Sequence, residues 1–94
     1  ARPVPRESLQ GMRVLVVDDA EINLLLMREQ LNNAGLRPHC CQDPREAIPI
    51  MQQALEEGDP FAFAIIDYFM PHMDGEELGR AIQAQTQLRD TLMI

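Results

Sequence analysis

Two apolar runs that each stop at aspartate constrain the fold of this chain more than any other feature. Residues 14–17 end at the pair Asp18-Asp19, and residues 61–66 end at Asp67. A run that is apolar at successive positions suits a strand buried on both faces, as in a parallel sheet covered by helices. We therefore expect two central parallel strands, each followed by carboxylates at its C-terminal end.

The segments around these runs alternate helical and strand patterns. Apolar side chains recur at helical spacing in three of them, residues 20–34, 43–57 and 74–85. Residues 36–42 form a short strand at a sheet edge, because Pro38 cannot donate to a ladder, and residues 91–94 begin a fourth strand. The order β-α-β-α-β-α-β predicts a three-layer α/β fold with parallel strands joined by right-handed crossovers.

Two of the helices carry clear start signals. Asp43 and Asp74 are each followed by glutamate three positions later, and Pro44 occupies the first helical position of the middle helix. Pro49 lies farther into that helix, where a kink is expected.

The aspartates are expected to meet at one edge of the sheet, where ligands of open α/β sheets bind. If the two apolar runs are neighbours, Asp18, Asp19 and Asp67 converge within a few ångströms. Like charges that close repel, and a hard cation such as Mg²⁺ relieves the repulsion while leaving positions for water and phosphate. A single aspartate after a strand is more often a helix cap or turn former, and Asp19 has that alternative at the first helix.

The length, charge and cysteine content of the chain argue against several classes of partner and environment. The 94 residues suffice for one small domain, and 15 acidic against 8 basic residues give a net charge of −7. This balance argues against binding to nucleic acid or to an anionic membrane surface. No apolar run approaches the roughly 20 residues that span a bilayer. The adjacent Cys40 and Cys41 cannot build a disulfide framework, which favours a reducing compartment.

The segment after the third strand carries a family pattern. Asp67-Tyr-Phe-Met-Pro71-His-Met-Asp74-Gly75 fits D-x-x-M-P-x-M-D-G, and the acid pair precedes it by 48 residues, counted from Asp19. With these motifs, residues 12–94 resemble the receiver domain of response regulators and hybrid sensor histidine kinases. The Ala-Glu-Ile-Asn23 that follows the acid pair is similar to receivers attached to hybrid kinases.

The resemblance implies a flavodoxin-like, doubly wound sheet in the order 2-1-3-4-5. The chain ends at Ile94, inside the fourth strand, so we expect a partial receiver domain over residues 12–94 with the fifth strand missing, preceded by a linker over residues 1–11. A hybrid sensor kinase as the parent would make that parent a protein histidine kinase. It would place this domain in the cytoplasm, in the cytoplasmic part of a membrane-anchored protein.

The resemblance also implies the chemistry. Asp67 is the phosphoacceptor, and Mg²⁺ is bound by Asp19, by Asp67 and by the backbone carbonyl of Phe69, with Asp18 helping through water. The phosphoryl donor is a phosphohistidine on a histidine kinase or a histidine phosphotransfer domain.

Two family features are absent from the chain. Receivers also use a Ser or Thr after the fourth strand and a Lys after the fifth, whereas this chain contains no lysine. We therefore expect slow phosphoryl uptake without switching. The fourth strand would be an exposed edge that invites a dimer or a domain swap.

Three alternatives to the receiver chemistry are compatible with parts of the sequence. A phosphorylation-incompetent pseudo-receiver that acts only by protein contact stays open. A phosphohydrolase of the haloacid dehalogenase type needs a second Asp two residues after the nucleophile, where Phe69 stands. A zinc site at His39, Cys40 and Cys41 is disfavoured because side chains alternate faces along a strand. His72, in the acceptor loop, is read as a solvent-facing loop residue.

Overall fold

Four parallel strands form the centre of the molecule. The computed structural model describes residues 10–67, 74–85 and 92–93. Within them the strands are β1 (Arg13–Val17), β2 (Arg37–Cys41), β3 (Phe61–Ile66) and β4 (Leu92–Met93), in the order β2-β1-β3-β4. The predicted parallel sheet and its order are confirmed, including the place of the proline-containing strand at an edge. Exchange of β4 between two chains stays a prediction.

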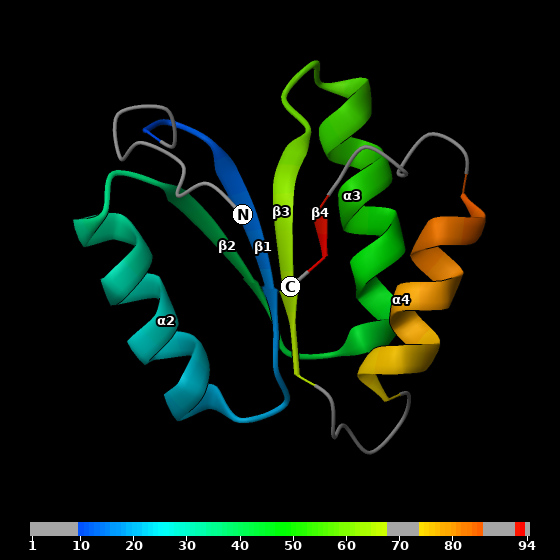
Figure 1. Ribbon diagram of the computed structural model, residues 1–94, viewed down its shortest axis with the longest axis horizontal. Helices are drawn as coiled ribbons and strands as arrows, with labels where there is room; N and C mark the ends of the chain where they lie inside the picture. Colours follow the sequence, from blue (N-terminus) through cyan, green and yellow to red (C-terminus); the bar gives the residue numbers. More distant parts are fainter. Residues whose placement is uncertain (1–9, 68–73, 86–91, 94) are drawn as a thin grey trace, which may run out of the picture.

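Helices cover the sheet from both sides, as predicted. α2 (Glu21–Asn33) lies on one face, and α3 (Ala47–Glu56) and α4 (Gly75–Ala84) lie on the other (Figure 1). A 3-10 turn, η1 (Pro44–Glu46), leads into α3. In the segments that the structure describes, no helix has the length and apolar character needed to cross a membrane.

The central strand β1 explains the three layers. Val14 and Val16 pack on the α2 side, whereas Leu15 and Val17 pack on the side of α3 and α4. All four are almost completely shielded from water. Burial of such a side chain contributes about 1.5–3 kcal/mol, so the alternating faces of one strand tie the helical layers together.

The helix starts are largely as predicted, with one correction. The Asp43 carboxylate accepts a hydrogen bond from the backbone N–H of Arg45, and the Asp74 carboxylate accepts one from Glu77. The predicted middle helix is divided, because η1 precedes α3 and the α-helix begins only at Ala47. Pro49 is therefore the third residue of α3, where a backbone N–H has no helical partner and none is lost.

The amino ends of the strands are joined by ion pairs around Asp59. Arg37 binds both carboxylate oxygens of Asp59, at 2.7 and 2.9 Å, and its Nε donates to the Gly11 carbonyl. Arg13 donates to the Asp59 carbonyl at 2.9 Å and lies over the Phe61 ring, 4.4 Å from its centroid. The hydrogen bonds from Arg37 hold the pKa of Asp59 below its ordinary value. This carboxylate is thus neutralised by the protein itself.

Candidate functional site

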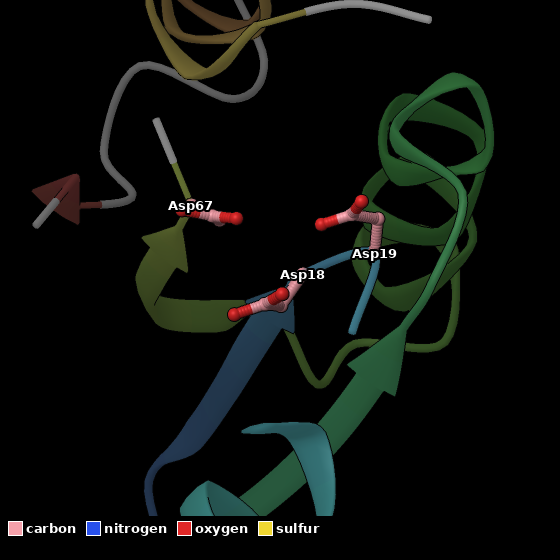
Figure 2. A group of neighbouring side chains, drawn as sticks. All are labelled: Asp18, Asp19 and Asp67. Atoms are coloured by element: carbon pink, nitrogen blue, oxygen red, sulfur yellow. The ribbon is translucent and has the colours of Figure 1, made fainter. Parts of the chain in front are cut away.

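Three carboxylates meet at the opposite, carboxyl-end edge of the sheet. Asp18 and Asp19 follow β1, and Asp67 follows β3. One oxygen from each lies within 4.8 Å of the others. Figure 2 shows Asp19 and Asp67 facing one another, with Asp18 beside the gap between them. The convergence expected from the sequence is present.

Strand register brings these residues to one level. Val17, the last residue of β1, pairs with Ile66 on one side and with Cys41 on the other. The ladder then extends by one step on each side, since Asp67 N–H donates to the Val17 carbonyl at 2.8 Å and Asp18 N–H donates to the Cys41 carbonyl at 3.1 Å. Asp18 and Asp67 therefore occupy the first positions beyond the paired strands, and Asp19 occupies the next one after Asp18.

Asp18 is held more firmly than its neighbour. Its Oδ1 accepts from the backbone N–H of Ala20 at 2.9 Å, and its Oδ2 accepts from the side-chain amide of Asn23 at 3.2 Å. The exposed Asp19 is engaged through its backbone carbonyl, which accepts from the Gln42 amide at 3.0 Å. The alternative that Asp19 caps the first helix is wrong, because Ala20 is the N-cap of α2 and Asp18 supplies the local hydrogen bond.

Asn23 and Gln42 are the contacts that sequence reasoning missed. In the sequence, Asn23 was noted only as part of a motif that resembles the family. The signal that could have identified its contact is the direction of helical side chains, which point back toward the start of the helix and so toward Asp18. Gln42 gave no comparable signal, since its partner lies 23 positions earlier in the chain.

The donor set suits a hard divalent cation. In the part of the chain that the structure describes, these three aspartates are the one group of three or more His, Cys, Asp or Glu side chains that converge. Within the same segments, neither Asp18 nor Asp19 forms an ion pair with a basic side chain. Carboxylate oxygens are the ligands that Mg²⁺ takes from proteins, usually one or two at a time with waters completing the shell. The residues present therefore fit such an ion.

The groove beside the acidic group continues under α2. It has a volume of about 330 Å³ and is lined at its polar end by Asp18, Asn23 and Asp67. Farther along, Leu26 and Ile65 contribute apolar walls. Asp18 and Asp67 therefore line a groove that is open to solvent.

The cysteines are not part of this site. Cys41 is buried on the α3 and α4 side, whereas Cys40 packs on the α2 side, so the expected alternation is confirmed. The Cys41 thiol donates to the Asp43 carbonyl at 3.0 Å, and burial raises its pKa to about 11. Zinc binds the thiolate, which this environment disfavours. The predicted carbonyl ligand at Phe69 and the loop residue His72 lie outside the described residues.

Comparison with known proteins points to one family. The response regulator receiver domain family matches residues 14–94. The virulence sensor protein BvgS of Bordetella bronchiseptica is 37% identical over 84 residues, which cover 89% of this chain and 6% of that protein. The chain spans less than a tenth of the length of the curated relatives that it matches. Several of these relatives are named as histidine kinases.

Solved structures agree in fold. The chemotaxis protein CheY4 of Vibrio cholerae superposes with a TM-score of 0.79 at 31% identity, covering 88% of this chain and 65% of that one. The receiver domain of the histidine kinase CKI1 from Arabidopsis thaliana, complexed with Mg²⁺ and BeF₃⁻, gives a TM-score of 0.73 at 34% identity. That comparison covers 84% of this chain and 59% of the other. With its flavodoxin-like sheet and the matched residues 14–94, the chain belongs to the response regulator receiver domain family.

Proposed function

We propose that this domain is the phosphoacceptor of a two-component phosphorelay, taking a phosphoryl group onto Asp67 with the help of Mg²⁺. The observation that carries the proposal is the convergence of Asp18, Asp19 and Asp67 within 4.8 Å at the carboxyl edge of the sheet. A pseudo-receiver that only makes protein contacts has no need of three carboxylates in this arrangement. Their mutual repulsion is a cost that a bound cation offsets.

Asp67 is the nucleophile in this proposal. Both carboxylate oxygens of Asp18 accept N–H groups, from Ala20 and Asn23, which fixes this side chain as part of the proposed metal site. Asp67 comes from the other strand and begins the D-x-x-M-P segment that carries the family pattern. By that resemblance its side chain is the one that receives the phosphoryl group.

The reaction transfers a phosphoryl group between two side chains. An oxygen of Asp67 forms a bond to phosphorus while the bond from phosphorus to the donor imidazole nitrogen breaks. The imidazole leaves with that electron pair and takes a proton from solvent, and the product is an acyl phosphate. A bound Mg²⁺ supplies positive charge that offsets the charge on the phosphoryl oxygens. Asp18, Asp19 and Asp67 would hold it, with the carbonyl of Phe69 added by resemblance to the family.

The donor is proposed to be a phosphohistidine on a histidine kinase or a histidine phosphotransfer domain. The comparisons support this choice, since the named relatives include histidine kinases. The parent protein is proposed to be a hybrid sensor histidine kinase whose receiver works in the cytoplasm. Sequence of the flanking coding region tests that assignment, and a parent without a kinase domain would contradict it.

A protein donor needs a surface beside the site, and α2 offers one. The helix begins next to the acid pair and exposes three large apolar side chains, Ile22 at 61%, Leu25 at 45% and Leu26 at 52% of their full area. Single apolar residues on a surface are ordinary, but a group of them beside a reactive site indicates an interaction surface. We assign contact with the donor to this group.

Phosphoryl uptake tests the assignment of Asp67. The chain is incubated with Mg²⁺ and phosphoramidate, and its intact mass is recorded. We expect the wild type to gain one phosphoryl group and Asp67→Asn to gain none, because an amide is a far weaker nucleophile than a carboxylate. Asp59→Asn, an aspartate outside the site, is the control and should label like the wild type. A wild type that gains nothing, or an Asp67→Asn variant that still labels, would reject the proposal.

Leu25→Asp tests the surface on α2. A charge within an apolar contact should slow transfer from a phosphorylated histidine-containing protein by on the order of tenfold, while leaving uptake from phosphoramidate unchanged. Asn32→Asp adds the same charge near the far end of the same helix and is the matched control. Equal slowing by both variants, or slowing with the small donor too, would contradict a specific contact at Leu25.

A further inference from the structure

We infer that Asn23 and Gln42 are positioning residues, which hold the Asp18-Asp19 pair in the arrangement that a divalent cation requires. The two amides come from separate elements, the first turn of α2 and the segment after β2. Asn23 contacts the side chain of Asp18, and Gln42 contacts the backbone of Asp19. The inference rests on the metal site proposed above and adds to it the residues that shape the site.

Asn23 fixes the side chain of Asp18. Its amide donates to Oδ2 at 3.2 Å, while the backbone N–H of Ala20 donates to Oδ1 at 2.9 Å. With one donor on each oxygen, the carboxylate cannot rotate without losing a hydrogen bond. If either donor is removed, Asp18 can rotate about its side-chain bonds and lose its direction relative to Asp67.

Gln42 fixes the backbone of Asp19. Its amide donates to the Asp19 carbonyl at 3.0 Å. One residue earlier along the edge strand, the Cys41 carbonyl accepts from Asp18 N–H at 3.1 Å. The end of β2 therefore holds both members of the acid pair through their main chain. The contact of Gln42 uses the main chain of the exposed Asp19 and not its carboxylate.

The chemistry of the two donors fits this role. Amides are neutral, so they orient the acid pair without cancelling its negative charge. An arginine in place of Asn23 would set a positive charge against the Asp18 carboxylate, as Arg37 does against the Asp59 carboxylate at the other end of the sheet. Partners that orient metal ligands from outside commonly act through such hydrogen bonds.

A purely structural role explains Asn23 poorly. Both amide contacts are solvent-exposed, and an exposed hydrogen bond adds little to the free energy of unfolding. Asparagine is also a weaker helix former than alanine. Replacing Asn23 by alanine should therefore leave the fold as stable as before, or more stable, and a loss of cation affinity would have to come from the site.

The test compares Mg²⁺ affinity with stability in the same variants. Isothermal titration calorimetry gives the dissociation constant, and urea unfolding without Mg²⁺ gives the stability. We expect Asn23→Ala to weaken Mg²⁺ binding about tenfold. Gln42→Ala, which loses a neutral contact to a carbonyl, should weaken binding about threefold. Unfolding midpoints should be equal to or above that of the wild type.

Matched controls separate the outcomes. Asn32→Ala changes the same residue type near the far end of α2, and Gln53→Ala changes an exposed glutamine on α3; both should bind Mg²⁺ like the wild type. Unchanged affinity in Asn23→Ala and Gln42→Ala would overturn the inference while leaving the proposed function intact. Weaker binding that tracks a matching loss of stability would overturn it as well. A wild type that binds no Mg²⁺ would overturn both the metal site and the positioning role.

Discussion

The two ends of this sheet treat negative charge in opposite ways. At the amino end, the Asp59 carboxylate is bound by both terminal nitrogens of Arg37, and Arg13 lies 3.7 Å from the same group. At the carboxyl end, three carboxylates share one small volume, and the side-chain donors identified around the acid pair are amides. The protein neutralises charge where the charge serves the fold. At the other end, within the described segments, neither Asp18 nor Asp19 pairs with a basic side chain, and an ion from solution is proposed to bind there.

The difference follows from what each arrangement stabilises. An arginine-carboxylate pair with two parallel hydrogen bonds is complete without any ligand. Neighbouring carboxylates repel one another until a cation binds, and the relief of that repulsion adds to the free energy of binding. The amino-end cluster should therefore matter for stability and the carboxyl-end group for function. Replacing one aspartate at each end by asparagine tests the two roles separately.

The largest effect is expected from Asp19→Asn at the carboxyl end. Loss of one charged ligand should weaken Mg²⁺ binding by at least about tenfold. Phosphoryl uptake from phosphoramidate should fall by on the order of 100-fold, because the charge that develops on the phosphoryl oxygens is then poorly offset. Calorimetry and a time course of intact mass measure the two quantities.

The same variant should keep its stability. Removing one of three neighbouring carboxylates relieves repulsion, so the urea midpoint without Mg²⁺ should equal or exceed that of the wild type. A clear loss of stability in Asp19→Asn would mean that this end of the sheet also supports the fold, and the contrast between the two ends would fail.

Much of the fold was predictable because its signals are local. Continuous apolar runs, Pro38 at an edge and the aspartates before two helices each act within a few residues, and the structure confirms them. The start of α3 was misjudged because a 3-10 turn and an α-helical turn share the same cap. Side-chain spacing in the sequence does not distinguish them over three residues.

The sequence predicted the aspartates that follow the strands, but not the side chains that contact them. Asp18, Asp19 and Asp67 follow buried strands, so the parallel order alone brings them together. The contact between Gln42 and Asp19 depends on where the β2 chain turns after the sheet, which no periodicity records. For the same reason the ion pairs of Arg13 and Arg37 with Asp59 were not foreseen, since they join three separate segments.

The smaller effect is expected from Asp59→Asn at the amino end. The variant keeps the size of the side chain but loses its charge in the pairs with Arg37 and Arg13. Because these side chains are partly exposed, the melting temperature should fall by a few degrees at most. Phosphoryl uptake should be unchanged, opposite to the result for Asp19→Asn. A variant that lost uptake at unchanged stability would reverse the roles of the two ends.

Unfolding at acid pH tests whether the contribution of Asp59 to stability comes from its charge. Hydrogen bonds from Arg37 hold the pKa of Asp59 in the folded chain below its ordinary value of 3.8. Its contribution to stability is therefore present above that ordinary value and is lost as the pH falls through the lower folded pKa. Urea midpoints of wild type and Asp59→Asn should differ by a constant amount between pH 6 and pH 7 and converge below about pH 4. A difference that persisted undiminished in acid would show that the Asp59 contribution does not come from its charge.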